Sequence, residues 1–268
     1  MATIRKEWKE FYRTSLIYLV VGLIILTSTF VLLQFTGMDV NVSFRSGLVP
    51  VFQTSLYFLP LIALAYGALA MANEKTDRTL PILLARGISV KRFVLKKFAS
   101  LFAVFLPVVV GSYFLAMIPA RFIFCRLVVS DLLYFLLSVL ILSTVFLALG
   151  MLIGAWINQK LRLIGAVIGV WLILLCLFDL VLMYVMPHVS ISQVFVFSLV
   201  YFLSPINAVQ YFLLSLLNIF QLSDLSAYYK QLTFQMPGLV VLSNLVFWVS
   251  VSVWGSILGL RKKGMSRD

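Results

Sequence analysis

The sequence predicts an all-α integral membrane protein, and its composition, its charge-free stretches and the placement of its basic residues all support that class. Hydrophobic residues make up 63% of the 268 positions, whereas charged residues make up 11%. A water-soluble domain could not solvate so apolar a surface, so lipid is the expected main solvent. Six charge-free windows are long enough to cross a bilayer. They lie at about residues 15–35, 47–72, 98–120, 132–157, 163–186 and 238–260.

The basic residues indicate how these windows are oriented. Seventeen of the 21 Lys and Arg residues lie near the two termini or in the segments 73–97 and 158–162, and the alternate loops hold four. Because Lys and Arg are enriched on the cytoplasmic side, both termini are expected in the cytoplasm and the chain in the cytoplasmic membrane. Basic residues at the ends of apolar runs address lipid headgroups, so nucleic-acid binding is not expected despite the net charge of +12.

Residues 1–14, ahead of the first window, are expected to form a short helix lying flat at the inner membrane interface. Its apolar side chains fall on one face at helical spacing, at Ile4, Trp8, Phe11 and Tyr12. A basic leader without structure is the alternative. The window that follows is interpreted as a retained anchor, because no small-residue cleavage site follows it.

Residues 73–97, between the second and third windows, form a basic amphipathic stretch. Residues 79–84 make an apolar patch, with Arg78 and Arg86 on either side. Ser89 can then cap a second, basic helix. A short cytosolic helix that presents leucines and arginines is suited to a groove on a partner protein. The alternative is that the segment only snorkels at the membrane surface.

Residues 187–237 form an outer segment that is expected to contain two helices, at 189–203 and 205–222. Ser204 and Pro205 have the pattern of an N-cap followed by proline at the first helical position. Four amides in the second helix fall within an arc of about 80°, and a helix facing lipid would not carry such a stripe. These amides are Asn207, Gln210, Asn218 and Gln221. Both helices are therefore expected to be re-entrant or interfacial at the outer leaflet.

Three Gly-x3-Gly pairs allow close helix approach, either within the chain or between two copies. They are Gly150 and Gly154, Gly165 and Gly169, and Gly255 and Gly259.

Motifs for catalysis and for cofactor binding are absent from the sequence. There is no phosphate-binding G-x-x-x-x-G-K-[ST] loop and no H-E-x-x-H pattern. The only histidine, His188, has no nearby acid except Asp179, so a serine nucleophile would lack a base. The chain is therefore predicted not to be an enzyme and to hold no cofactor of its own.

Asp179 is the only carboxylate inside a predicted window, and such a group is expected to face the bundle interior or water. One interpretation pairs Asp179 with an amide or hydroxyl of a neighbouring helix and treats the nearby Met and Cys residues as apolar filler. The other is a translocation path for a soft metal ion such as Cu(I). That path would comprise Cys176, Asp179, Met183, Met186 and His188.

The segment 73–97 resembles the one between the second and third spans of ABC-2-type transporter permeases. The family pattern is an acid, a Thr-Leu pair, a Leu-Leu pair, a Pro-x-Ser step and a closing Lys. The residues that carry it here are Glu74, Thr79, Leu80, Leu83, Leu84, Ser89 and Lys97, with Arg78 where the family often has Gly and Ile88 where it often has Pro.

This resemblance implies that residues 73–97 contain a coupling helix, docked onto a separate ATPase subunit that binds ATP and Mg. The docking segment would consist of the matching residues together with Arg78 and Arg86. The resemblance also implies a single transmembrane domain over residues 1–268, of the type V exporter kind. It has six spans, the interfacial helix and the outer re-entrant helices, and it pairs with a second copy of the chain.

Within that family the chain is most similar to the NosY-like permeases of the nitrous oxide reductase maturation system. Similar stretches lie at 59–64, 169–182 and 204–210. The resemblance implies an outer copper-maturation protein as partner. Pro205, Asn207 and Gln210 mark its candidate contact region, where those permeases typically show Asn-Pro-x-Asp-x-x-Arg.

Two other functions remain open. Lipid, drug or peptide export would suit the phenylalanine-rich spans, and a membrane scaffold would recruit a protein without moving cargo.

Overall fold

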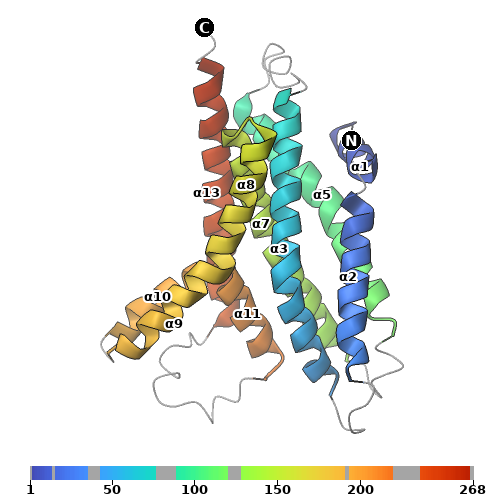
Figure 1. Cartoon of the computed structure of the whole chain (residues 1–268), viewed down its shortest axis with the longest axis vertical. Helices are drawn as coiled ribbons and strands as arrows, with labels where there is room; N and C mark the ends of the chain where they lie inside the picture. The colour runs from blue at the N-terminus through green and yellow to red at the C-terminus, as the bar shows by residue number, and fades with distance from the viewer. Residues whose placement is uncertain are drawn as a thin grey trace.

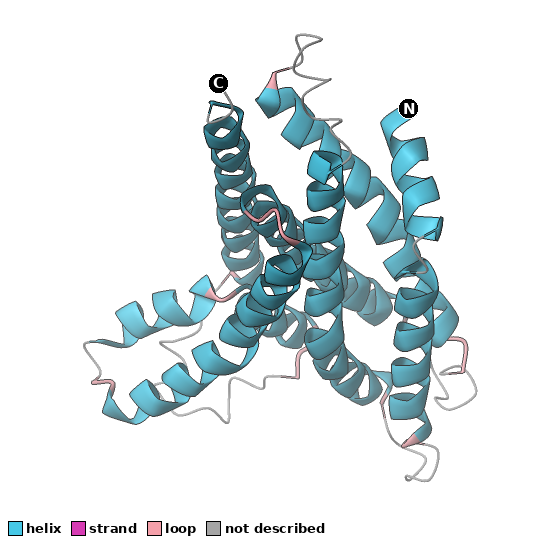
Figure 2. Ribbon diagram, turned by 45° about the horizontal axis from the view of Figure 1, so that its top comes forward, coloured by secondary structure: helices cyan, strands magenta, loops and turns pink. Residues whose placement is uncertain are grey.

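A computed structural model describes most of the chain, and every element in the described parts is a helix (Figures 1 and 2). These parts are residues 2–13, 16–35, 43–76, 89–119, 128–190, 193–219 and 236–265. The predicted all-α membrane class is confirmed.

The first part of the chain forms the short helix α1 and four longer helices. In order these are α1 (Ala2–Arg13), α2 (Leu16–Leu33), α3 (Phe44–Thr76), α5 (Val90–Ala116) and α7 (Val129–Trp156). The second half is more broken. It comprises α8 (Lys160–Leu172), the π-helix η1 (Ile173–Leu177), α9 (Phe178–Val185), the 3-10 helix η2 (Met186–His188), α10 (Val194–Leu203), α11 (Pro205–Leu216) and α13 (Pro237–Met265).

Five of the described helices are long and apolar enough to cross a membrane, and they coincide with the last five predicted windows. They run over Phe44–Lys75, Val90–Ala116, Val129–Trp156, Lys160–His188 and Pro237–Arg261. The first window corresponds to α2, which carries no charge but is shorter than the others. Several helices extend past the windows. Their backbone hydrogen bonds continue into turns that carry charged residues, which the charge-free windows exclude by definition. The 33 residues of α3 span about 50 Å, and the helices include Glu74 and Asp131, which the windows leave out.

Both chain termini lie at the same end of the bundle in Figure 1, here called the terminal end. The end of α3, the start of α5 and the turn between α7 and α8 lie there as well. This arrangement agrees with the predicted placement of both termini and of residues 73–97 on one side.

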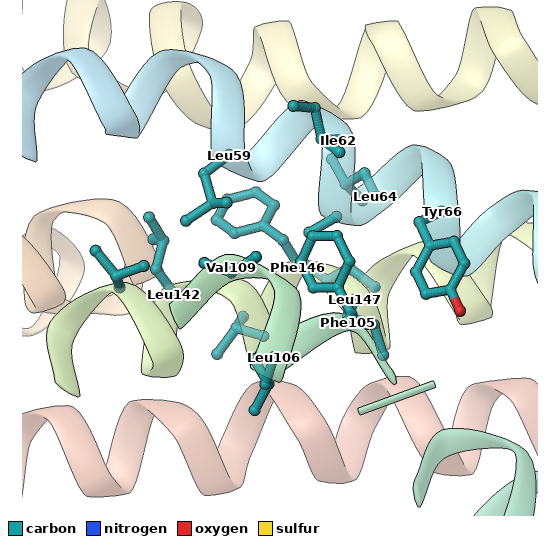
Figure 3. Close-up of a cluster of buried hydrophobic side chains, with 14 of the residues drawn as sticks. Leu59, Ile62, Leu64, Tyr66, Phe105, Leu106, Val109, Leu142, Phe146 and Leu147 are labelled. Carbon is teal, nitrogen blue, oxygen red and sulfur yellow. The ribbon is translucent and has the colours of Figure 1, made fainter. Parts of the chain in front are cut away.

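The core lies where α3, α5 and α7 meet, as Figure 3 shows. Leu64 of α3, Phe105 of α5 and Phe146 of α7 are among its fully buried side chains. In α3 and in α7, 72% of the most apolar window is buried, against 11% in the helix Lys160–His188. The bundle is therefore built on α3 and α7, and the α8–α9 helix lies at its surface.

Glycines let α3 and α7 approach each other closely. A Cβ added at Gly150 would lie well inside 3.0 Å of the carbonyl oxygen of Leu64, and one at Gly154 equally close to that of Ala68. Since backbone atoms cannot rotate away as a side chain can, only glycine fits at these positions. The Gly150–Gly154 pair therefore packs within the chain.

The other two glycine pairs differ from each other. Gly255 and Gly259 of α13 lie against side chains of α7, and the Trp156 Nε1 donates to the Gly255 carbonyl at 3.1 Å. A Cβ added at Gly165 or Gly169 would meet nothing within 4 Å. That pair is not used for packing in the described part of the chain.

Polar contacts join α3 to α7 at both ends of the bundle. At the end away from the termini, Arg45 Nε donates to Asp131 Oδ2 at 2.8 Å. At the terminal end, Lys75 Nζ donates to the Ile157 carbonyl at 2.8 Å and to Asn158 Oδ1 at 3.0 Å. A lysine at this place satisfies carbonyls that the end of α7 leaves unpaired.

The two helices α10 and α11 form the predicted break at Ser204 and are bent by 101°. Ser204 is the N-cap of α11, with its side chain accepting from the Asn207 N–H at 3.5 Å, and Pro205 follows at the first position. Within the described residues α11 stops at Leu216 instead of 222, because Asn218 adopts the left-handed conformation with φ of 53°. Likewise, α10 begins at Val194 instead of 189.

The carbonyls at the end of α10 are satisfied by α13. Asn244 Nδ2 donates to the Phe202 carbonyl at 2.8 Å, and Trp248 Nε1 donates to the Leu203 carbonyl at 2.9 Å. Free carbonyls at the end of an apolar helix need partners within the protein wherever water is excluded.

Candidate functional site: the junction of α1, α3 and α5

The junction lies at the terminal end, around the side chain of Lys97. Lys97 Nζ donates to Glu74 Oε1 of α3 at 2.9 Å and also to the Glu7 carboxylate of α1. The exposed fraction of the side chain is 2% for Lys97, 2% for Glu7 and 8% for Glu74. One lysine of α5 therefore joins three helices through buried ion pairs.

The helical spacing of α1 directs two side chains into this junction. Glu7 and Phe11, four residues apart, lie on the same face and are both buried. The Phe11 ring packs against Tyr66 of α3, with centroids 4.6 Å apart, and against Phe105 of α5 at 6.3 Å. The ion pair and the aromatic contact together hold α1 against the bundle.

The face of α1 differs in part from the predicted one. Trp8 and Tyr12 are exposed, whereas Phe11 is buried, and the side chain of Ile4 lies outside the described residues. The apolar face is thus divided: Phe11 packs on the protein, while Trp8 and Tyr12 are exposed where they can meet lipid headgroups.

The negative charge of the Glu7 carboxylate is energetically unfavourable because the side chain is buried. Burial raises the pKa of the Glu7 carboxyl above its ordinary value, although the Lys97 ammonium lowers that pKa in part. Two carboxylates share this one ammonium, so neither has a full counter-charge from it.

The ion pair of Glu74 with Lys97 closes the base of the predicted coupling segment. Arg78, Thr79, Leu80, Leu83, Leu84 and Arg86 lie outside the described residues. Glu74 and Lys97 border that segment as buried residues and expose little surface to a partner. Ser89 is the N-cap of α5 but makes no side-chain capping hydrogen bond, and the predicted second helix is the first part of the span itself.

Residues 1–264 match the family described as ABC-2 family transporter protein. This chain belongs to the ABC-2 transporter family. The ABC-2 permease is thus a transmembrane subunit, as the resemblance of residues 73–97 implies. No curated protein matches it.

Asp179 of the permease pairs with the amide of a neighbouring helix. Asn207 Nδ2 of α11 donates to Asp179 Oδ1 of α9 at 3.2 Å, and Asp179 is half-buried. This is the contact that the structural interpretation of Asp179 predicts, although the amide comes from the outer helix α11.

The other residues of the candidate metal path are exposed on this chain. Cys176, Met183 and His188 all face outward, as does Met186. A regular helix would align them with Asp179, but Cys176 lies in the π-helix η1 and Met186 in the 3-10 helix η2, which change the register. Within the described residues, no group of three or more His, Cys, Asp or Glu side chains could hold a metal ion.

The candidate contact region for an outer partner lies at the start of α11. Pro205 and Asn207 are buried, and Gln210 is half-buried. Asn207 is occupied by Asp179. Of the three, Gln210 offers the most surface.

The sequence pattern of residues 1–14 did not single out Glu7. The available signal was its position on the same helical face as Phe11, an acid beside the apolar face of a helix in which basic residues outnumber acids. An acid there is favourable only if a cation from elsewhere in the fold meets it, and that cation is 90 residues away along the chain.

Proposed function

We propose that this ABC-2 permease works in the cytoplasmic membrane as a pair of copies, with both termini in the cytoplasm. A separate ATPase subunit binds ATP and Mg and docks at residues 73–97. The family match over residues 1–264 carries this proposal, because the sequence contains no phosphate-binding loop of its own.

The junction around Lys97 supports a coupling role for residues 73–97. The chain leaves α3 after Thr76 and enters α5 at Val90. Glu74 lies in the last turn of α3 and Lys97 about two turns into α5, and these two residues form an ion pair at 2.9 Å. A force applied to the segment therefore acts on α3 and α5 together. Since α3 is joined to α7 by glycine contacts and by polar contacts at both ends, this force would move the core of the permease as a rigid body.

A charged residue in the apolar patch should separate the two subunits. We expect Leu83→Glu to abolish co-purification of the ATPase subunit and to lower ATPase activity in the membrane complex at least about tenfold. The reason is that a buried glutamate in an apolar groove would lack a partner. The measurement is ATP hydrolysis by the complex purified through a tagged permease and reconstituted in lipid nanodiscs.

Leu161→Glu is the matched control for this experiment. Leu161 is 84% exposed and follows Lys160 at the terminal end of α8, so the same substitution there places the charge on the same side of the membrane. Its complex should retain its ATPase subunit. Equal ATPase activity in the two variants would contradict docking of the ATPase subunit through Leu83. A parent complex without ATPase activity would instead favour a scaffold that moves no cargo.

We further propose the narrower role in maturation of the copper sites of nitrous oxide reductase, with an outer copper-maturation protein as partner. The sequence similarity at 59–64, 169–182 and 204–210 supports this role. Reductase isolated from cells lacking the permease should contain no copper. Reductase with its full copper content would instead favour a lipid, drug or peptide as cargo.

The hydrogen bond from Asn207 to Asp179 suggests that Asp179 has a structural role and does not bind a metal ion. We expect Asp179→Asn together with Met183→Leu to leave the copper content of the reductase unchanged. Asparagine can still accept the 3.2 Å hydrogen bond from Asn207, and Met183 is 72% exposed. Loss of copper in this variant, with the protein folded, would support a metal path through α9.

A further inference from the structure

The hydroxyl of Tyr66 is an unexplained feature next to the junction. It is buried and has no hydrogen-bond partner in the part of the chain that the structure describes. In Figure 3 this hydroxyl points away from the apolar cluster formed by α3, α5 and α7. A buried hydroxyl without a partner is unfavourable, so its place in a folded protein needs a reason.

The packing places Tyr66 within reach of the junction. Its ring contacts Phe11, which lies one helical turn after Glu7 on the same face of α1. On α3, Tyr66 lies about two turns before Glu74. The Glu7 carboxylate accepts from the Lys97 ammonium, and the Tyr66 hydroxyl is a buried donor without a partner, on the ring that packs against the next turn of α1.

We infer that Glu7 has two alternative hydrogen-bond partners, Lys97 and Tyr66, and that exchange between them changes how α1 is held against α5. In the structure Glu7 accepts from Lys97. In the alternative state Glu7 accepts from the Tyr66 O–H, while Lys97 keeps its ion pair with Glu74. Glu7 and Lys97 are thus positioning residues for the coupling segment.

The exchange leaves no polar group of the junction without a partner. Lys97 retains one carboxylate, Tyr66 gains an acceptor, and the two carboxylates no longer crowd one ammonium. The Phe11 contacts with Tyr66 and Phe105 can persist in both states, because only the neighbouring turn of α1 has to move. The link of this exchange to ATP hydrolysis rests on the proposed function, whereas the exchange itself does not.

Distances between spin labels test the exchange in the full-length permease without any ATPase subunit. Labels at Lys9→Cys on α1 and Arg92→Cys on α5 replace exposed side chains, with Cys125 and Cys176 changed to serine. In lipid nanodiscs we expect two distance populations. Tyr66→Phe should reduce the second population about tenfold, as expected when a hydrogen bond to a charged group is lost.

Tyr57→Phe is the matched control, since Tyr57 is an exposed tyrosine of the same helix. It should leave both populations unchanged. A single distance population in the parent protein, or an unchanged second population in Tyr66→Phe, overturns the exchange.

The same labels in the complex with the co-purified ATPase subunit test the link to ATP. Trapping with ADP and vanadate should shift the ratio of the two populations. If the ratio is the same with and without nucleotide, the link to ATP is overturned. The exchange itself is then still supported by the measurement on the permease without the ATPase subunit. Failure of the ATPase subunit to bind overturns the proposed function instead.

Discussion

Gly150→Ala is expected to separate α3 from α7 and to destabilise the whole bundle. The new methyl group would overlap the backbone carbonyl of Leu64, and relief requires one helix to move away from the other. This overpacking should cost about 3 kcal/mol or more, at the upper end of the range for core insertions. The measurement is the free energy of unfolding in mixed detergent micelles, from titration with a denaturing detergent.

Gly165→Ala is the control for this prediction. Gly165 lies inside α8 and a Cβ added there meets nothing within 4 Å. Removing glycine from a helix should leave the protein as stable or stabilise it by about 0.5 to 1 kcal/mol. Equal losses in the two variants would show that the approach of α3 and α7 is not set by Gly150.

Lys97→Met is expected to have an effect of similar size, through charge instead of shape. Methionine can fill the space of the lysine stem, but Glu7 and Glu74 would lose the ion pairs that they form with Lys97. Removal of one partner from a buried ion pair costs about 3 to 5 kcal/mol. Besides the free energy of unfolding, the rate of proteolysis within α1 should rise, because Glu7 no longer ties α1 to α5.

Two variants distinguish charge from packing at this site. Lys96→Met removes an exposed neighbouring lysine, and its effect should stay within about 0.5 kcal/mol. Glu7→Gln added to Lys97→Met should recover part of the lost stability, because one uncompensated carboxylate is gone. A Lys97→Met protein as stable as Lys96→Met would contradict the role given to the ion pairs.

Local sequence patterns predicted the helices well. A charge-free run longer than a bilayer and a Ser-Pro step are recognisable without any contact information, and the structure has helices at all six windows and the break at Ser204. The ends were less predictable: α5 begins at Val90, well before the window at 98, because its basic turns continue the helix beyond the apolar part.

The candidate site was predicted only in part. Glu74 and Lys97 were recognised from the family pattern, but as members of a docking surface and not as a buried ion pair. Glu7 was missed because its role depends on Lys97, which is far along the chain and is brought near only when α1 packs on α3 and α5. Similarly, the common face of Cys176 and Met183 was predicted for a regular helix, whereas Cys176 lies in the π-helix η1.

The amino-acid sequence by itself determined the solvent of this protein, the number and position of its apolar segments and its family, since these depend on composition and local order. Only the tertiary structure decided which of the three glycine pairs packs α3 against α7, and which acids meet Lys97. The physical reason is that close packing and buried charge pairing depend on distances between helices, and residues far apart in the chain set those distances together.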